Sequence, residues 1–146
     1  MADIQLRIKR FDKDLELPVY AKPGDAGLDL RSAIDADIEP GCRKLIPTGI
    51  ALGIPAGFAG FIQPRSGLAL KQGMTIVNTP GLIDSGYRGE IGVVALNTDL
   101  KETIHIKRGD RVAQLVIQAV PVVEVVEVQE LDLTERSETG FGSSGL

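Results

Sequence analysis

The chain has 146 residues, the size of one ordinary domain, and its 43% hydrophobic and 25% charged residues exclude an intrinsically disordered protein. The formal net charge is −4, whereas a protein that coats nucleic acid normally carries a basic stripe. We therefore expect a globular protein with no nucleic-acid partner.

The amino-terminal residues and the single cysteine predict a cytoplasmic location. Residues 1–10 alternate charged and apolar side chains instead of forming the apolar stretch of a signal peptide. No apolar run approaches the ~20 residues that a membrane helix needs, so we expect no membrane association. Cys42 has no second cysteine with which to form an internal disulfide, and we expect it to be a reduced residue without a catalytic role.

Short apolar patterns along the rest of the chain predict mostly β-strands. Apolar residues alternate with other residues at 4–8, 50–54 and 104–106, which is the period of half-buried strands. Three runs are almost continuously apolar and suit strands buried on both faces, at 91–96, 112–120 and 122–128. Turn signals such as Pro-Gly separate these stretches at short intervals. The pattern predicts an all-β barrel or sandwich of the jelly-roll type.

A short helix is predicted over residues 66–73, with a candidate phosphate site at its start. Ser66 is a suitable N-cap residue, and Gly73 closes a run of good helix formers. Backbone N–H groups at the start of a helix lack helical partners, and Gly67 lets a ligand come close to them. Arg65 can donate two hydrogen bonds to phosphate oxygens. The alternative is a surface arginine beside an ordinary helix cap.

The segment 78–90 carries a second candidate group. Its glycines predict a hairpin whose backbone can approach a flat ligand. Asp84 follows two apolar residues, so we expect it to be half-buried, where a carboxylate can serve as a general base. Tyr87 lies in the same turn. The alternative is an aspartate that is satisfied within its turn, beside a surface tyrosine.

Further polar residues each allow two roles. Asp25 and Asp29 could help to hold a hard cation such as Mg²⁺, and the alternative for Asp25 is to cap a turn. Asp110 and Arg111 could simply pair with each other in a turn. Gln114 lies among apolar residues, where a buried amide needs hydrogen-bond partners.

The single histidine and the end of the chain are the last features to interpret. His105 alternates with isoleucines, so we expect it to face solvent. Residues 136–145 place an arginine, serines and glycines around one phenylalanine, and these groups suit a phosphate and a nucleobase. The alternative for these residues is a tail without a fixed structure.

Taken in chain order, five of these segments resemble the motifs of the homotrimeric dUTPase family, whose members convert dUTP to dUMP and diphosphate. The matching residues are Ala26-Gly27-Leu28-Asp29-Leu30, Pro64-Arg65-Ser66-Gly67-Leu68-Ala69, Gly81-Leu82-Ile83-Asp84 with Tyr87 and Gly89, Gly109-Asp110-Arg111-Val112-Ala113-Gln114-Leu115, and Arg136 with Gly140-Phe141-Gly142-Ser143-Ser144-Gly145. The motifs extend from residue 26 to residue 145, so the resemblance covers nearly the whole chain.

The resemblance implies a fold, an assembly and a substrate. The fold would be a distorted jelly-roll-like β-barrel of the β-clip type over residues 1–135, with one short helix. A flexible glycine-rich arm, residues 136–146, would close over the active site. The assembly would be a homotrimer whose active sites are shared between subunits. The substrate would be dUTP and the cofactor Mg²⁺, and the product dUMP would supply thymidylate synthesis while uracil is kept out of DNA.

The resemblance also implies a role for individual residues. Asp84 would orient and deprotonate the water that attacks the α-phosphorus, Asp29 would contact Mg²⁺ through water, and Tyr87 would lie against the deoxyribose. The residues that would bind uracil are Asn78, Gly81, Leu82, Ile83 and, through its backbone, Gly92. The residues that would bind phosphates are Arg65, Ser66, Gly67 and Gln114. The residues that would close over the ligand are Arg136, Phe141, Ser143 and Ser144, with Phe141 stacking on uracil.

Two alternative functions use the same scaffold. The dCTP deaminases, and the bifunctional deaminase–diphosphatases, resemble one another in a glutamate base on the strand after the hairpin. The aligned position here is Val94, which leaves no acid to activate water at C4 of cytosine. A non-catalytic nucleotide-binding module would bind dUTP tightly without turning it over.

Overall fold

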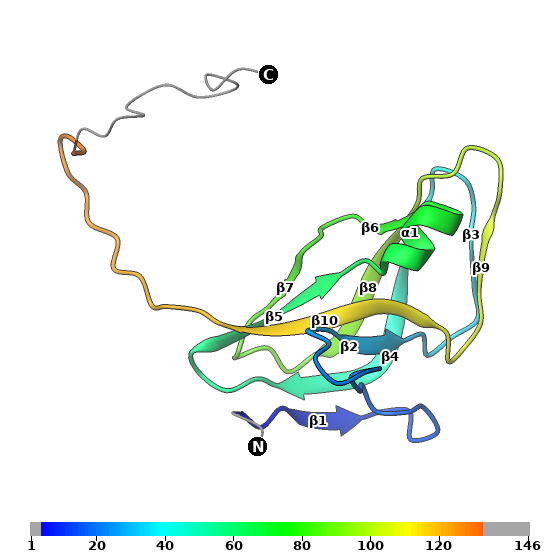
Figure 1. Cartoon of the computed structure of the whole chain (residues 1–146), viewed down its shortest axis with the longest axis horizontal. Helices are drawn as coiled ribbons and strands as arrows, with labels where there is room; N and C mark the ends of the chain where they lie inside the picture. Colours follow the sequence, from blue (N-terminus) through cyan, green and yellow to red (C-terminus); the bar gives the residue numbers. More distant parts are fainter. Residues whose placement is uncertain (1–3, 133–146) are drawn as a thin grey trace.

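The computed structural model describes residues 4–132, and these residues form ten β-strands and one short helix (Figure 1). The strands are β1 (Arg7–Arg10), β2 (Leu28–Arg31), β3 (Ala36–Ile38), β4 (Arg43–Gly53), β5 (Phe58–Gln63), β6 (Met74–Ile76), β7 (Gly81–Ile83), β8 (Glu90–Asn97), β9 (Ile104–Ile106) and β10 (Arg111–Ala119). The helix is α1 (Ser66–Gln72). The predicted all-β class with one short helix is confirmed.

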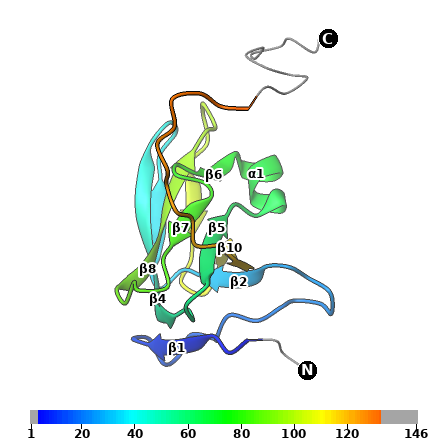
Figure 2. The ribbon, with the colours of Figure 1, turned by 90° about the vertical axis from the view of Figure 1, so that its left-hand side faces the viewer.

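The strands form two four-stranded antiparallel sheets and one two-stranded sheet. The first sheet has the strand order β1-β4-β8-β6, the second has the order β2-β10-β5-β7, and β3 pairs with β9. Figure 2 shows β4 and β8 on one side of the molecule and β5 and β10 on the other. The non-sequential order brings the ends of β2, β5 and β10 together, although they are far apart along the chain.

The hydrophobic core lies between the two larger sheets. Its most completely buried side chains include Leu30, Ile46, Leu52, Ile91 and Leu115. Strand β8 alternates strictly, with one face buried and the other more exposed. The expectation that residues 91–96 are buried on both faces is therefore wrong for the single chain, because only one face of β8 meets the core.

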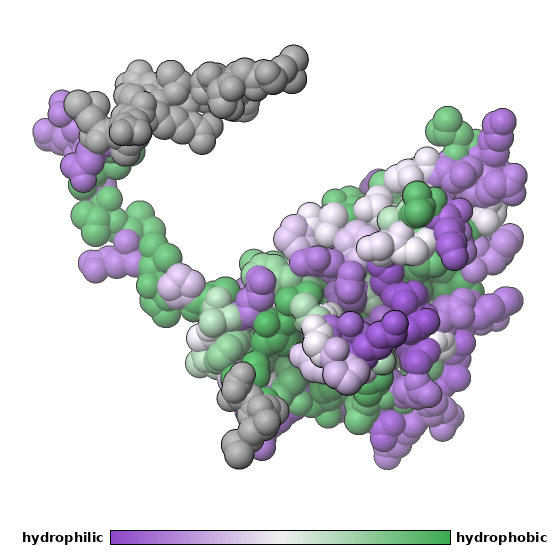
Figure 3. Space-filling view, viewed as in Figure 1, coloured by the Kyte–Doolittle hydropathy of each residue, from purple (hydrophilic) through white to green (hydrophobic). Residues whose placement is uncertain are grey.

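The valine-rich run at 122–128 is not a strand, which contradicts the prediction. After β10 the chain continues through these residues without pairing with any strand of the described range, and the valines are exposed, with Val122 at 97% and Val125 at 91%. Figure 3 shows this segment as a hydrophobic stretch that leads away from the body of the molecule. Apolar composition indicates that a surface is to be buried, but it does not indicate what buries it.

Helix α1 is confirmed, with one correction at its start. The N-cap residue is Arg65, in an extended conformation and without a side-chain cap hydrogen bond, so Ser66 is the first helical residue and not the cap. Gly73 ends the helix in the left-handed region, with φ of 66°, and its N–H donates to the carbonyl of Ala69. The Gly73 position is also crowded, because a Cβ there would stand 2.9 Å from Thr98 Oγ1.

The segment 78–90 is not a two-stranded hairpin. Strand β7 pairs with β5 in the second sheet, whereas β8 pairs with β4 and β6 in the first. The residues between β7 and β8 therefore connect the two sheets. The sequence pattern indicated the turn correctly, but it could not show that the two strands find different partners.

Three features outside the core are also visible in the structure. Cys42 is exposed. His105 is exposed on β9, as predicted, and its Nδ1 lies 2.7 Å from Asp37 Oδ1. Among residues 4–132, no helix is long and apolar enough to cross a membrane.

The Asp12–Arg108 ion pair makes stability depend on pH. Arg108 donates to both Asp12 oxygens at 2.7 Å, and this hydrogen bonding lowers the pKa of the Asp12 carboxyl below its usual range. A carboxyl whose pKa is lower in the folded state stabilises the fold above the unfolded-state pKa of about 3.9, and that contribution is lost as the pH falls below it. Between pH 7 and pH 3, the free energy of unfolding is expected to fall less in Asp12→Asn than in the wild type.

Denaturant unfolding at a fixed protein concentration measures this difference. The matched control is Asp132→Asn, an exposed aspartate outside the sheets, which should keep the wild-type pH dependence. An unchanged pH dependence in Asp12→Asn would show that the ion pair carries no pH-linked stability.

Candidate functional site

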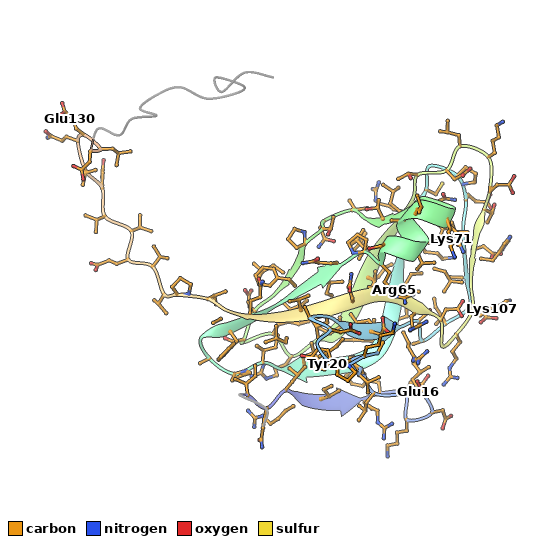
Figure 4. The ribbon with its side chains drawn as sticks, in the orientation of Figure 1. Glu16, Tyr20, Arg65, Lys71, Lys107 and Glu130 are labelled. Atoms are coloured by element: carbon orange, nitrogen blue, oxygen red, sulfur yellow. The ribbon has the colours of Figure 1, made fainter. Side chains whose placement is uncertain are left out.

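A polar cleft of about 430 Å³ lies where β2, β5 and β10 meet the start of α1. Figure 4 shows Arg65 at this junction. The residues of the cleft that bear on its chemistry are Asp25, Gly27, Asp29, Arg65, Arg111 and Gln114, and Ser66 and Gly67 also line it. The predicted phosphate-binding residues Arg65, Ser66, Gly67 and Gln114 are thus together in one cleft with Asp29.

The register of three neighbouring strands places these residues side by side. Gln114 on β10 lies opposite Asp29 on β2 and opposite Gln63 at the end of β5. The Gln114 side-chain amide donates to the carbonyl of Pro64 at 2.8 Å, which provides the partner that a half-buried amide needs. A Cβ at Gly27 would stand 2.7 Å from Gln114 Oε1 and 3.2 Å from Gln114 Cβ, so any larger residue at position 27 would displace the Gln114 side chain.

Asp29 binds two arginines at once. Its Oδ1 lies 3.1 Å from Arg65 Nε, and its Oδ2 lies 3.1 Å from Arg111 Nη1. The Asp29 side chain is only 15% exposed, so this charge is compensated by ion pairs rather than by bulk water. The charged residues that line the cleft, Asp25 and Asp29 with Arg65 and Arg111, balance in number, but both guanidinium groups converge on Asp29 and concentrate positive charge there, which suits an anionic ligand.

The aspartates of the cleft do not form a direct chelate for a metal ion. Among the described residues, no cluster of three or more His, Cys, Asp or Glu side chains could hold a metal. Asp25 accepts a hydrogen bond from the backbone N–H of Lys22 at 2.8 Å, the turn-capping alternative. Both Asp29 oxygens face arginines. A hard cation in this cleft would therefore contact these aspartates through water and not directly.

The second group of predicted residues lies on β7 and the segments on either side of it. The residues of this group are Asn78, Gly81, Leu82, Ile83, Asp84 and Tyr87. The Asn78 amide lies over Gly81, where a Cβ would stand 3.4 Å from Nδ2. The Tyr87 hydroxyl donates to the carbonyl of Glu90 at 3.1 Å, and the ring covers Gly89, where a Cβ would collide with it. These contacts fix the tyrosine ring although 45% of the residue is exposed.

Asp84 is exposed in the single chain, not half-buried as expected. Strand β7 is the edge strand of its sheet among the described residues, so no further strand lies beyond it to cover the residues that follow. The neighbouring Leu82 is 58% exposed on the same edge. The two apolar residues before Asp84 predicted that its side chain is half-buried, but nothing in the described part of this chain covers it.

The two groups do not meet within one chain. Strands β2 and β7 are separated by β10 and β5, which amounts to three strand spacings, or about 14 Å. In the antiparallel register of β7 and β5, Ile83 lies opposite Gly60. Continued by one residue, this register places Asp84 opposite Ala59, which is four residues along β5 from Gln63. These four residues span about 13 Å along the strands, at right angles to the roughly 14 Å across them. The backbone of Asp84 is therefore about 20 Å from that of Asp29.

The remaining predicted residues lie elsewhere. Gly92 is on β8 in the first sheet, and a Cβ there would stand 2.7 Å from Leu45 Cδ1, so the side chain of Leu45 covers it. The predicted closing residues Arg136, Phe141, Ser143 and Ser144 lie outside the described residues.

The sequence did not indicate the role of Arg111. Its local alternative, a pair with Asp110, does not form: Asp110 instead accepts a hydrogen bond from the backbone N–H of Lys107 at 2.8 Å, while Arg111 reaches Asp29 on β2. The contact joins residues 82 positions apart.

Comparison with known proteins agrees with the five motifs. The dUTPase family model matches residues 13–145. The deoxyuridine 5'-triphosphate nucleotidohydrolase of Corynebacterium jeikeium is 53% identical over 147 residues, covering 99% of this chain and 95% of that protein. The dUTPase of Staphylococcus bacteriophage 80alpha, solved with dUpNHpp, has a TM-score of 0.89 and 32% identity over 97% of this chain and 99% of its own.

A further solved structure concerns the metal. It is a mutant dUTPase from phage phi11 of S. aureus, which reveals the coordination of a structural Mg(II) ion. It has a TM-score of 0.82 and 28% identity, covering 89% of this chain and all of that one. The predicted resemblance and the jelly-roll-like fold are thereby confirmed, and this chain belongs to the dUTPase family.

Proposed function

We propose that the chain is a dUTP diphosphatase that hydrolyses dUTP to dUMP and diphosphate. The observation that carries the proposal is the cleft in which Asp29 holds Arg65 and Arg111 beside Gln114 and the start of α1, in a member of the dUTPase family. Two guanidinium groups that converge at one point of a cleft suit a polyphosphate chain. The neighbouring solved structure with bound dUpNHpp supports a deoxyuridine triphosphate as the ligand.

The phosphate end of the substrate is assigned to the cleft. Arg65 and Gln114 offer side-chain donors, and Ser66 and Gly67 offer backbone N–H groups that have no partner within α1. A bound Mg²⁺ would neutralise phosphate charge as it shifts toward the leaving diphosphate. Asp29 would contact that ion through water, because its two oxygens face arginines and do not form a chelate with other carboxylates.

The base and the nucleoside contacts are assigned to the second group. Asp84 would orient and deprotonate the water that attacks the α-phosphorus. Its carboxylate is exposed, so a substrate and the attacking water can reach it. Asn78 and the backbone of residues 81–84 would bind uracil, with Gly92 contributing through its backbone. Tyr87, with its ring fixed against Gly89, would lie where a 2′-hydroxyl would collide.

The active site is completed between chains. In one chain the backbones of Asp84 and Asp29 are about 20 Å apart, with β10 and β5 between β2 and β7, so we assign the base that serves one cleft to a neighbouring chain. Exposed apolar residues provide surface for such an assembly, among them Leu45, Leu82 and the valines at 122, 123, 125, 126 and 128. We assign the homotrimer of the family to this chain, in the cytoplasm.

The carboxy-terminal arm, residues 136–146, would close the site. Arg136, Ser143 and Ser144 carry donors for phosphate, and Phe141 carries a ring that can stack on uracil. Closure over the ligand would exclude water other than the attacking molecule. The dUMP produced would supply thymidylate synthesis, and removal of dUTP would keep uracil out of DNA.

The alternatives have less support. The position at which a deaminase carries its glutamate is Val94, a half-buried valine opposite Leu45, and it supplies no acid. A non-catalytic nucleotide-binding module would have no use for Asp84 as a base. The deaminase and the binding module each predict an outcome that can be measured.

The proposal is tested by measuring diphosphate release from dUTP, dTTP, dCTP and UTP. Each nucleotide is assayed with Mg²⁺ and with excess chelator. Release is expected from dUTP alone and only with Mg²⁺. A collision with the 5-methyl group must exclude dTTP, because a missing contact alone gives about 1–3 kcal/mol of discrimination. Ammonia release from dCTP would favour the deaminase, and tight dUTP binding without release would favour the binding module.

A further inference from the structure

Arg111 is part of the cleft without any role assigned to it so far. Its side chain is 44% exposed, against 27% for the Arg65 side chain, and both arginines line the same cleft. Arg111 Nη1 is held by Asp29 Oδ2 at 3.1 Å, and the backbone carbonyl of Arg111 accepts a hydrogen bond from Arg65 Nη1 at 3.3 Å. The two arginines are therefore connected twice, through Asp29 and through the Arg111 backbone.

The position of Arg111 is set by the fold rather than by its own neighbours. It is the first residue of β10, and its pairing with Arg31 on β2 is followed by a register shift before Ala113 pairs with Leu30. The shift marks a β-bulge or similar irregularity, a feature that redirects the side chains of a strand. The other close arginine–aspartate pair of this region, Arg108 with Asp12, lies outside the cleft.

We propose that Arg111 is a second phosphate-binding arginine of this cleft, and that Asp29 holds Arg65 and Arg111 in place until a polyphosphate takes over as their partner. The inference rests on the proposed function, because it names a further residue for the same substrate. A carboxylate and a phosphate oxygen accept the same forked hydrogen bonds from guanidinium, so a phosphate can replace Asp29 without moving the arginines far.

This exchange also reconciles two roles of Asp29. In the structure both of its oxygens face guanidinium groups, whereas the resemblance assigns it a water-mediated contact with Mg²⁺. Phosphate oxygens that engage the arginines would leave the Asp29 oxygens free to accept hydrogen bonds from water. Polyphosphate binding and metal binding would then support each other, because both need the Asp29 carboxylate to be free of the two arginines.

Calorimetric binding of inorganic tripolyphosphate, dUpNHpp and dUMP to the full-length protein tests the inference. Arg111→Gln is expected to bind tripolyphosphate and dUpNHpp about 10- to 100-fold more weakly, as for the loss of a charged hydrogen bond, and to bind dUMP as the wild type does. Arg111→Lys, which keeps the charge but not the fork, should recover part of the loss. Arg108→Gln, the matched control, should bind all three ligands as the wild type does.

The possible outcomes separate phosphate binding by Arg111 from a structural role of Arg111. They also separate a failure of this inference from a failure of the proposed function. Equal binding of tripolyphosphate by Arg111→Gln and wild type would overturn the inference. An equal loss for dUMP and the triphosphates would also overturn it, because it would indicate a general disturbance of the cleft. A wild type that neither binds dUpNHpp nor hydrolyses dUTP would contradict the proposed function itself.

Discussion

An Asp84→Asn variant is expected to bind dUpNHpp as the wild type does and to release diphosphate from dUTP about 10²- to 10⁴-fold more slowly. Asparagine has nearly the shape of aspartate but cannot accept a proton from the attacking water. Asp84 is exposed at the end of an edge strand, so the substitution creates no cavity and leaves no buried group unpaired. The loss should therefore appear in kcat and not in the affinity for the analogue.

Steady-state release of diphosphate, together with calorimetric binding of dUpNHpp, separates these two effects. Asp37→Asn is the matched control, because Asp37 is an exposed aspartate that pairs with His105 on the two-stranded sheet. It should keep the wild-type rate. An Asp84→Asn variant with the wild-type kcat would exclude Asp84 as the base.

The features that the sequence predicted correctly depend on contiguous residues. Arg65 immediately precedes α1, which starts at Ser66 and has its helix formers and its closing Gly73 in one short stretch. His105 is flanked by isoleucines that point inward, so its own outward direction followed from the period of a strand. Local rules were sufficient in these cases because no distant strand had to be identified.

The features that the sequence missed depend on partners far along the chain. Strands β7 and β8 are close in sequence but pair in different sheets. Arg111 could have paired with its neighbour Asp110, and it reaches across the sheet to Asp29 instead. A periodic pattern indicates which face of a strand is buried, but it does not indicate which strand lies beside it.

Two further misses concern burial that the single chain does not supply. The apolar neighbours of Asp84 indicated a half-buried carboxylate, and the valines at 122–128 indicated a buried strand, yet Asp84 and these valines are exposed. We interpret both as surfaces that another subunit covers in the proposed trimer. On this interpretation the apolar pattern reflects the burial of the assembly, which residues 4–132 of one chain cannot display.

The division of the active site between chains predicts a second large effect. Arg65→Gln removes one of the two guanidinium groups of the phosphate cleft and leaves Asp29 with a single arginine. Alone, Arg65→Gln is expected to lose about 100-fold or more in kcat/KM, because the substrate phosphates lose a charged, bidentate partner and their position relative to the base. Asp84→Asn alone is similarly inactive. Neither variant carries both functional groups intact.

Mixing these two inactive variants tests most directly whether the active site is shared between chains. The proteins are denatured together in equal amounts, refolded and assayed for diphosphate release, with refolded wild type and each refolded variant as controls. If each site takes Asp84 from one chain and Arg65 from another, random assembly places both intact residues in about one quarter of the sites. A shared site therefore predicts about a quarter of the wild-type activity, and a mixture no more active than its parents would contradict it.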